Sequence, residues 1–172
     1  MRITKPVLIA FVYALLFAAA VCVVFYGDHI KYITHVYLLG LVAMFPFVYA
    51  AVWFQRKDVH DGVIGGKDAG KEGLKFVVIA TLFLIVFQAV FFIVSFRDYK
   101  VNYMQTVGPQ ILKEQILANK LKITEADIPK TIAADVEGVT LFKEITAVIF
   151  KTVFYGLFCS IITAILLRRK FK

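Results

Sequence analysis

The chain has 172 residues, a formal net charge of +8 and 60% hydrophobic residues, and only 19% of its residues are charged. Soluble proteins carry roughly 45–50% apolar and about 25% charged residues, and a soluble fold of this size cannot bury seventeen Phe and eight Tyr side chains. The composition excludes a disordered chain, a disulfide scaffold and an ordinary cytosolic enzyme, and it predicts an integral membrane protein.

Four apolar runs are long enough to cross a bilayer, whose hydrocarbon core of roughly 30 Å needs about 20 helical residues. They are Pro6–Tyr26, Ile33–Phe54, Phe76–Phe96 and Ile145–Leu167, and Lys151 is the only charged residue within them. Because backbone groups find no water in hydrocarbon, we expect helices, and the pattern lacks the alternation of a membrane barrel. The expected fold is an all-α membrane protein whose residues 1–172 form a single four-helix transmembrane domain.

The first run could also be a signal peptide, and Ala19-Ala20-Val21-Cys22 is similar to a lipoprotein cleavage box. However, the run exceeds the 7–15 apolar residues that are typical of a signal peptide. Val21 is also too large for the position before a lipidated cysteine. We therefore expect a retained helix, with lipidation as the alternative.

Four spans would place both termini on one side of the membrane. Lys and Arg are enriched in cytoplasmic loops. Eleven of the twenty basic residues lie before the first run, between the second and third, or after the fourth. The long segment Arg97–Glu144 on the other side carries no net charge. We expect cytoplasmic termini, with the positive charge facing anionic lipid, and no nucleic-acid partner.

Asp28, His29 and His35 lie at the outer edge formed by the short turn between the first two runs and the start of the second run. A metal or proton site is one interpretation. The two histidines are six residues apart, so they do not share a helix face, and no third ligand is evident. A polar cluster at the membrane interface is therefore the favoured interpretation.

The loop Gln55–Lys75 contains five of the ten glycines, so a phosphate cradle has to be considered. The Walker pattern requires Ser or Thr after Gly-Lys, whereas Asp68 follows Gly66-Lys67 and would repel phosphate. A turn followed by a short interfacial lead-in to the third run is favoured. Lys71 and Lys75 are expected to extend from the cytoplasmic end of that run.

The extramembrane segment 97–144 is predicted to contain two amphipathic helices that lie on the outer membrane surface or cap the bundle. Asn102–Leu121 has apolar residues at helical spacing, and Pro109 sets or kinks the start of that helix. Thr124-Glu125-Ala126-Asp127 indicates the capped start of a second helix that Gly138 ends. A solvated connector and a partner-binding lid both remain open.

Small residues recur every four positions in two of the runs, which places them on one helix face. Since helices in lipid associate through such faces, we expect each face to contact a helix of the bundle or of a second copy. The candidate packing residues are Ala10, Ala14 and Ala18 in the first run and Gly156, Ser160 and Ala164 in the fourth.

Two polar side chains lie inside predicted spans. Gln88 is the only amide there, and we expect it to hydrogen-bond a hydroxyl such as that of Thr81, Ser160 or Thr163. Lys151 is expected to reach back to the outer interface along its own stem. The alternative for both is a place on a transport path.

The chemistry of an enzyme is not evident in the predicted spans. They hold no acidic residue and no histidine in the interior of the bundle, and the zinc-protease pair of histidines four residues apart is missing. We therefore predict no catalytic, cofactor-binding or metal-binding residues and a protein that is not an enzyme.

The whole pattern resembles a known family. Gly70-Lys71-Glu72-Gly73-Leu74-Lys75-Phe76 leads into the third run, Arg97-Asp98-Tyr99 follows it, and the last run contains Gly156 and ends in Arg168-Arg169-Lys170. This is similar to the domain-of-unknown-function family 4199, four-helix inner-membrane proteins of Bacteroidota, although members are usually richer in glycine in the first span. Members are often encoded near a polyprenyl-phosphate glycosyltransferase, so the resemblance implies a membrane tether for an enzyme of lipid-linked sugar metabolism.

Two classes of function follow from the sequence. The first is a non-catalytic accessory or scaffold subunit that tethers a membrane or cytoplasmic protein partner through the basic loop and tail or the outer helices. The second is a small transporter or channel built as a homo-oligomer, with Gln88 and the small-residue faces lining the route. A polar cavity reaching the midplane would favour the second.

Overall fold

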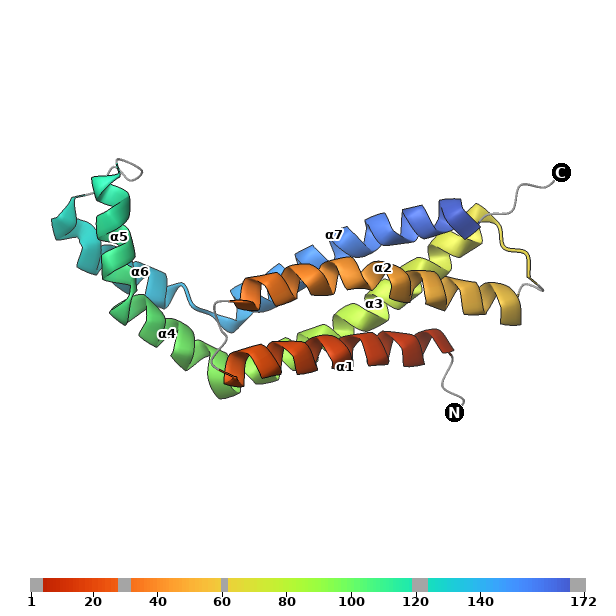
Figure 1. Ribbon diagram of the computed structural model, residues 1–172, viewed down its shortest axis with the longest axis horizontal. Coiled ribbons are helices and arrows are strands. Elements are labelled where there is room, and N and C mark those ends of the chain that lie inside the picture. Colours follow the sequence, from red (N-terminus) through yellow and green to blue (C-terminus); the bar gives the residue numbers. More distant parts are fainter. Residues whose placement is uncertain (1–4, 28–31, 60–61, 119–123, 168–172) are drawn as a thin grey trace. The chain divides into compact units, whose positions relative to one another are not determined.

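The computed structural model describes residues 5–27, 32–59, 62–118 and 124–167, and within these ranges it is helical and contains no strand. Its elements in chain order are α1 (Lys5–Tyr26), α2 (Ile33–Asp58), α3 (Gly66–Phe91), the π-helical segment η2 (Phe92–Phe96), α4 (Arg97–Thr106), α5 (Gly108–Leu117), the 3₁₀ turn η3 (Glu125–Asp127), α6 (Ile128–Glu137) and α7 (Leu141–Leu167) (Figure 1).

The chain divides into two compact units. The first comprises residues 1–87 and 148–172, and the second comprises residues 88–147. Helices α1 and α2 and most of α3 and α7 therefore belong to the first unit. Helices α4, α5 and α6 belong to the second.

Within the described residues, four helices are long and apolar enough to cross a membrane, which fits the expected multi-pass protein. Helix α1 begins within one residue of the predicted run, but α2 ends four residues later, and α7 begins four residues earlier. Helix α3 begins ten residues earlier, at Gly66. The added residues include Lys, Glu and Gln, which are good helix formers, so helices continue beyond the hydrocarbon-length runs.

The loop between α2 and α3 is shorter than the predicted Gln55–Lys75, because α3 takes up most of its glycines. Gly62 has a φ of 82°, a left-handed conformation that glycine adopts without steric cost. Its carbonyl oxygen accepts a hydrogen bond of 2.6 Å from Nε of Arg56. Its N–H donates to the Arg56 carbonyl at 2.9 Å. Arg56 thus closes the turn with both its backbone and its side chain.

Between α3 and α7 the described residues form the α-helices α4, α5 and α6, where the sequence suggested two helices. Helix α4 continues the third long helix, and α5 and α6 are separate from it. The long helix runs on without interruption from Gly66 to Thr106. A new helix then begins at Gly108, with Pro109 in its first turn. In the first turn the missing N–H of a proline costs no intrahelical hydrogen bond. Gly138 follows the end of α6, as predicted. Residues 119–123, which include the predicted helix end at Leu121, lie outside the described residues.

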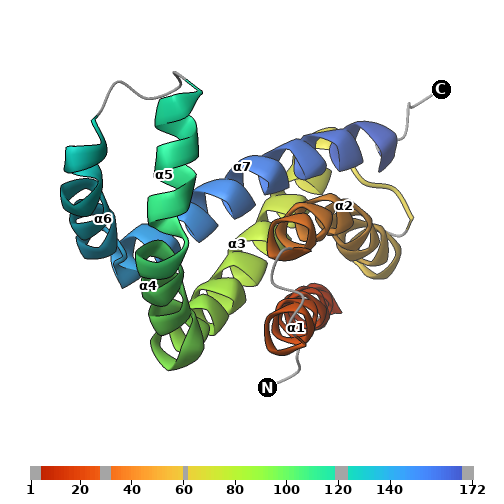
Figure 2. The same ribbon diagram turned by 60° about the vertical axis from the view of Figure 1, so that its left-hand side comes forward.

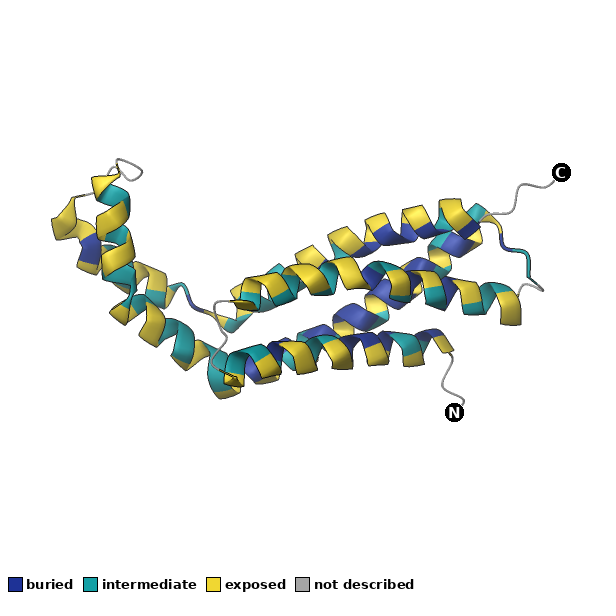
Figure 3. Ribbon diagram, in the orientation of Figure 1, coloured by how far each residue is buried: buried dark blue, intermediate teal, exposed yellow. Residues whose placement is uncertain are grey.

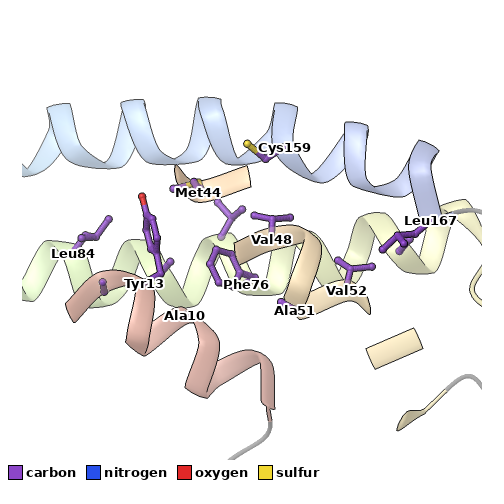
Figure 4. Packing of buried hydrophobic residues seen from close by; sticks show 14 of the residues in the cluster. Ala10, Tyr13, Met44, Val48, Ala51, Val52, Phe76, Leu84, Cys159 and Leu167 are labelled. Atoms are coloured by element: carbon purple, nitrogen blue, oxygen red, sulfur yellow. The ribbon is translucent and has the colours of Figure 1, made fainter. Parts of the chain in front are cut away.

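The core of the first unit is shared by all four long helices. Tyr13 of α1, Met44 of α2, Phe76 of α3 and Cys159 of α7 are among its buried residues, and Figure 4 shows these side chains pointing toward one another. The Tyr13 ring lies 6.0 Å from the Phe76 ring, centroid to centroid. Along the same helices, exposed positions alternate with buried ones as bands that follow the helical repeat (Figure 3).

Helices α1 and α2 form an antiparallel hairpin. Nζ of Lys5, at the start of α1, lies 2.6 Å from Oδ2 of Asp58, at the end of α2. The Tyr13 hydroxyl donates a hydrogen bond of 3.0 Å to the carbonyl of Gly40 on α2. A Cβ at Gly40 would collide with the ring of Phe17, so the absence of a side chain there lets the two helices approach closely.

Helices α3 and α7 also pack antiparallel, through small residues. A Cβ at Gly73 would lie 2.8 Å from the Ser160 hydroxyl and 3.2 Å from its Cα. Four residues farther along α3, the Val77 side chain occupies the space where Gly156 would carry a Cβ. The pairs Gly73–Ser160 and Val77–Gly156 are one turn apart on each helix and run in opposite directions, so they define the register of α3 against α7. Close backbone approach through small residues is typical of helices that associate in lipid.

The candidate packing residues of the sequence lie as follows. Ala10 and Ala14 are buried and Ala18 is half-buried. Gly156 and Ser160 are buried in the contact with α3, and Ala164 is half-buried against the core of the first unit. Which helix each face contacts is not evident from the sequence alone.

One hydroxyl in the first unit is buried without a hydrogen bond. Thr163 is 0% exposed, and its Oγ1 has no partner among the described residues. An unsatisfied buried polar group costs about 1–3 kcal/mol. Thr163→Val, which replaces the hydroxyl with a methyl group, should therefore raise the free energy of unfolding by about 1 kcal/mol, measured by denaturation in detergent micelles.

Thr81→Val is the matched control for Thr163→Val. The Thr81 hydroxyl is also buried, but it donates a 2.7 Å hydrogen bond to the carbonyl of Val77. The same substitution there removes a satisfied hydroxyl and should not stabilise the protein. Equal effects of the two substitutions would contradict the assignment of a penalty to Thr163.

Candidate functional site

The second unit contains an open groove between α5 and α6. Helices α4, α5 and α6 contact one another (Figure 2), and the groove between them has a volume of about 800 Å³. We call it the α5–α6 groove. Its lining is Gln105, Pro109, Lys113, Glu125, Ile128, Pro129, Ile132, Ala133, Val136 and Glu137.

The α5–α6 groove has an apolar floor and charged edges. Ile128, Ile132 and Val136 follow one another at four-residue steps, so they lie on one face of α6. Lys113 is contributed by α5, and Glu125 and Glu137 lie at the two ends of η3 and α6. An apolar floor with a few polar groups at its rim is the usual composition of a binding groove.

A capping box holds the start of α6 in place. The backbone N–H of Thr124 donates to Oδ2 of Asp127 at 3.1 Å, and its hydroxyl donates to the same oxygen at 2.6 Å. The N–H of Asp127 in turn donates to the Thr124 carbonyl at 3.0 Å. Pro129 follows in the first turn of α6. The predicted cap is thus present, and it fixes the side of the groove that α6 forms.

The same hydrogen bonds make the cap sensitive to pH. The Thr124 hydroxyl, and then its N–H, stabilise the ionised carboxylate and so lower the pKa of Asp127 below its ordinary value. A carboxyl with a lower pKa in the folded state stabilises the fold above the unfolded-state pKa, and the stabilisation is lost as the pH falls through the lowered pKa.

We therefore expect the backbone amides in the first turn of α6 to lose hydrogen-exchange protection as the pH falls through the lowered pKa of Asp127. Asp127→Asn should remove this pH dependence. Asp135→Asn, on the same helix outside the capping box, should keep it. Protection that is independent of pH in the unmodified chain would contradict the role of the cap.

An ion pair joins α4 to the start of α7 within the second unit. Nζ of Lys100 lies 2.5 Å from Oε1 of Glu144, and the two side chains are 33% and 19% exposed. The same ammonium lies 5.7 Å from the centroid of the Phe96 ring, which is a favourable cation–π distance. The pair is half-buried, so water screens it less than an ion pair on an open surface.

A second groove lies on α3 in the first unit. It has a volume of about 460 Å³ and is lined by Lys71, Leu74, Lys75, Val78 and Ile79. We call it the lysine-headed groove, because the two lysines stand one turn apart at the end nearest the start of the helix. Everything else that lines it is apolar.

The two predicted intramembrane polar residues lie in different units. Gln88 is 2% exposed and belongs to the second unit. Lys151 is exposed and belongs to the first unit. The hydrogen bond expected for Gln88 and the interfacial position expected for Lys151 stay predictions.

The described residues contain no group of three or more His, Cys, Asp or Glu that could hold a metal ion. Of the three residues weighed as a metal site, His35 is exposed. Asp28 and His29 lie outside the described residues. The basic tail from Arg168 to Lys172 and the basic start before Lys5 lie outside them as well.

Sequence reasoning missed both grooves. The apolar steps of Ile128, Ile132 and Val136 were a signal for one of them, since they give α6 an apolar face. The lysine-headed groove had its signal in the four-residue spacing of Lys71 and Lys75. Neither pattern alone shows that a groove is present, because the shape of the groove depends on the neighbouring side chains.

Neither the curated proteins nor the solved structures include a match to this chain. A family model does match it, that of a protein of unknown function (DUF4199), over residues 8–169. The match includes residues of both units and nearly all of the four long helices. The resemblance inferred from the Gly-rich lead-in and the last span is thus confirmed, and the chain belongs to the DUF4199 family.

Proposed function

We propose that this protein is a non-catalytic accessory subunit of the bacterial inner membrane that holds a partner protein in the α5–α6 groove. The groove itself is the observation that carries the proposal. It offers a large apolar floor bordered by Lys113, Glu125 and Glu137. Protein-docking surfaces combine a buried apolar centre with a polar rim in this way.

The proposal places α4, α5 and α6 outside the bilayer, on the side opposite the termini. Helices α5 and α6 have ten residues each, half of what a span requires. The capping box and the charged groove edges are polar groups that hydrocarbon would leave without water. The long helices would anchor this docking unit, and both termini would lie in the cytoplasm, where basic residues are enriched.

The test compares two neighbouring positions on α6. Ala133 and Ala134 are both exposed, but only Ala133 lines the groove. Ala133→Trp should fill the groove, and Ala134→Trp should add the same bulk outside it. Each variant is purified from native membranes in mild detergent, and the proteins that accompany it are identified by mass spectrometry.

A partner that accompanies the unmodified chain and Ala134→Trp, but not Ala133→Trp, would support the proposal. A glycosyltransferase in that position would also meet the expectation drawn from the family resemblance. Recovery of the chain alone, as a homo-oligomer, would overturn the proposal and favour the small transporter or channel. Equal recovery of a partner with both variants would exclude the groove as its docking site.

The proposed orientation has its own test. In a background of Cys22→Ala and Cys159→Ala, single cysteines are introduced by Ala134→Cys and Lys67→Cys, both at exposed positions. A membrane-impermeant maleimide added to intact cells should label the first and not the second. The reverse pattern would overturn the orientation with cytoplasmic termini.

A further inference from the structure

The lysine-headed groove is an apolar hollow on one helix face. The stems of Lys71 and Lys75 line it, while their ammonium groups contribute none of its lining surface. Lys71 lies three residues before Leu74 and four before Lys75, and Val78 follows Leu74 by four residues and Lys75 by three, which are the spacings of neighbours on a helix surface. We propose that this groove binds one anionic phospholipid of the surrounding bilayer. Its phosphate would lie at Lys71 and Lys75, and an acyl chain would lie along Leu74 and Val78.

The two ammonium groups are available to a ligand. The Lys71 and Lys75 side chains are 61% and 63% exposed. Nζ of Lys71 lies 3.9 Å from Oδ1 of Asp68, at the outer limit of an ion pair. Nζ of Lys75 donates a 2.6 Å hydrogen bond to Oε1 of Glu72. An ammonium has three donors, so each lysine keeps hydrogen-bonding capacity for a phosphate oxygen.

The acidic neighbours do not occupy the groove. Asp68 and Glu72 are not part of its lining, and the Glu72 side chain is only 14% exposed. Their charges oppose an anion and lower its affinity. A free phosphate gains only the two cations, so the acidic residues should keep its binding weak. A phospholipid gains the apolar channel as well and should bind more tightly.

The position of the groove along α3 suits a lipid. Lys75 immediately precedes the uncharged run 76–96, so the lysines stand at the boundary between headgroups and hydrocarbon. Below them Val78, Leu82 and Val86 are 56%, 58% and 63% exposed at successive four-residue steps. Val78 lines the groove, and Leu82 and Val86 extend from it along α3 as an exposed apolar stripe that an acyl chain can follow.

The positive charges of Lys71 and Lys75 favour an anionic phospholipid over a zwitterionic one. Juxtamembrane lysines attract anionic lipid, and basic pockets at helix ends bind anionic headgroups. A zwitterionic phospholipid offers the same chains but adds a cation that Lys71 and Lys75 would repel. The groove should therefore discriminate between headgroups rather than between chains.

The test is native mass spectrometry of the full chain in detergent, titrated with phosphatidylglycerol or phosphatidylcholine. The unmodified chain should retain phosphatidylglycerol in preference. The double variant Lys71→Gln/Lys75→Gln should bind it roughly thirtyfold more weakly, since each juxtamembrane lysine contributes about 1 kcal/mol and each 1.4 kcal/mol is a factor of ten in affinity. Lys71→Arg/Lys75→Arg should keep the binding.

The matched control is Lys57→Gln/Lys143→Gln, which removes two exposed lysines near the ends of α2 and α7. It should leave phosphatidylglycerol binding unchanged. Val78→Trp, which fills the channel and keeps both lysines, should weaken it. Inorganic phosphate at millimolar concentration should not displace the lipid.

Three results would overturn the proposal. One is equal retention of the two phospholipids by the unmodified chain. Another is equal loss in the groove and control double variants, which would show a general charge effect. The third is displacement by inorganic phosphate alone, which would show an anion site without a role for the channel.

Discussion

Gly156→Leu should separate α7 from α3 and lower the free energy of unfolding by about 3 kcal/mol, at the upper end of what overpacking costs. The Val77 side chain already fills the space beside Gly156. One turn away, Gly73 and Ser160 hold the two backbones close together, so a shift that relieves the collision would also break that contact. Denaturation in detergent micelles measures the loss.

Gly70→Leu is the control for this substitution. Gly70 lies on α3, three residues before Gly73, and a Cβ there would meet nothing within 4 Å. Replacing a helical glycine at an open position removes backbone entropy from the unfolded chain, so this variant should be neutral or slightly stabilising. Similar losses for both leucines would show that general helix effects, rather than the contact with Val77, set the stability.

Lys100→Ala should lower the free energy of unfolding of the second unit by about 2 kcal/mol. Removing one partner of a fully buried ion pair costs about 3–5 kcal/mol, and the partial exposure of this pair reduces the effect. Glu144 would keep a carboxylate that is 19% exposed without the cation that lies 2.5 Å away. Hydrogen exchange of the amides in α4 and in the first turns of α7 should report the loss.

Two further variants distinguish the ion pair from a general effect of charge. Lys71→Ala breaks a 3.9 Å contact between exposed side chains, and exposed pairs are worth about 0–1 kcal/mol, so it should change little. The charge swap Lys100→Glu/Glu144→Lys should recover part of the protection. A swap as damaging as Lys100→Ala would locate the effect in packing against Phe96 instead.

The sequence predicted the long helices well where the apolar run alone decides the helix. Helix α1 has no charged residue after Lys5, and its start and end fall within one residue of the prediction. The predicted start of the third run, Phe76, lies ten residues after the first residue of α3, Gly66. The prediction is late because glycines at 66, 70 and 73 favour a loop locally. The role of Gly73 becomes clear only in the folded structure, where it meets Ser160. Tertiary packing overrode the local preference.

The candidate sites were less accessible to prediction. The capping box at Thr124 and Asp127 is local in sequence and was found. The α5–α6 groove joins residues 105–113 with residues 125–137, and a single sequence does not show that these segments meet. The π-helical segment Phe92–Phe96 left no recognised pattern either, since one extra residue per turn does not alter an apolar run.

The pairing of α3 with α7 has a consequence for biogenesis. Ser160 follows Gly73 by almost ninety residues, and ribosomes elongate at about 5–20 residues per second. For roughly 5–20 s after its synthesis, the side of α3 that contains Gly73 therefore has no α7 to pack against. During that interval only contacts among α1, α2 and α3, such as the contact of Tyr13 with Phe76, can form.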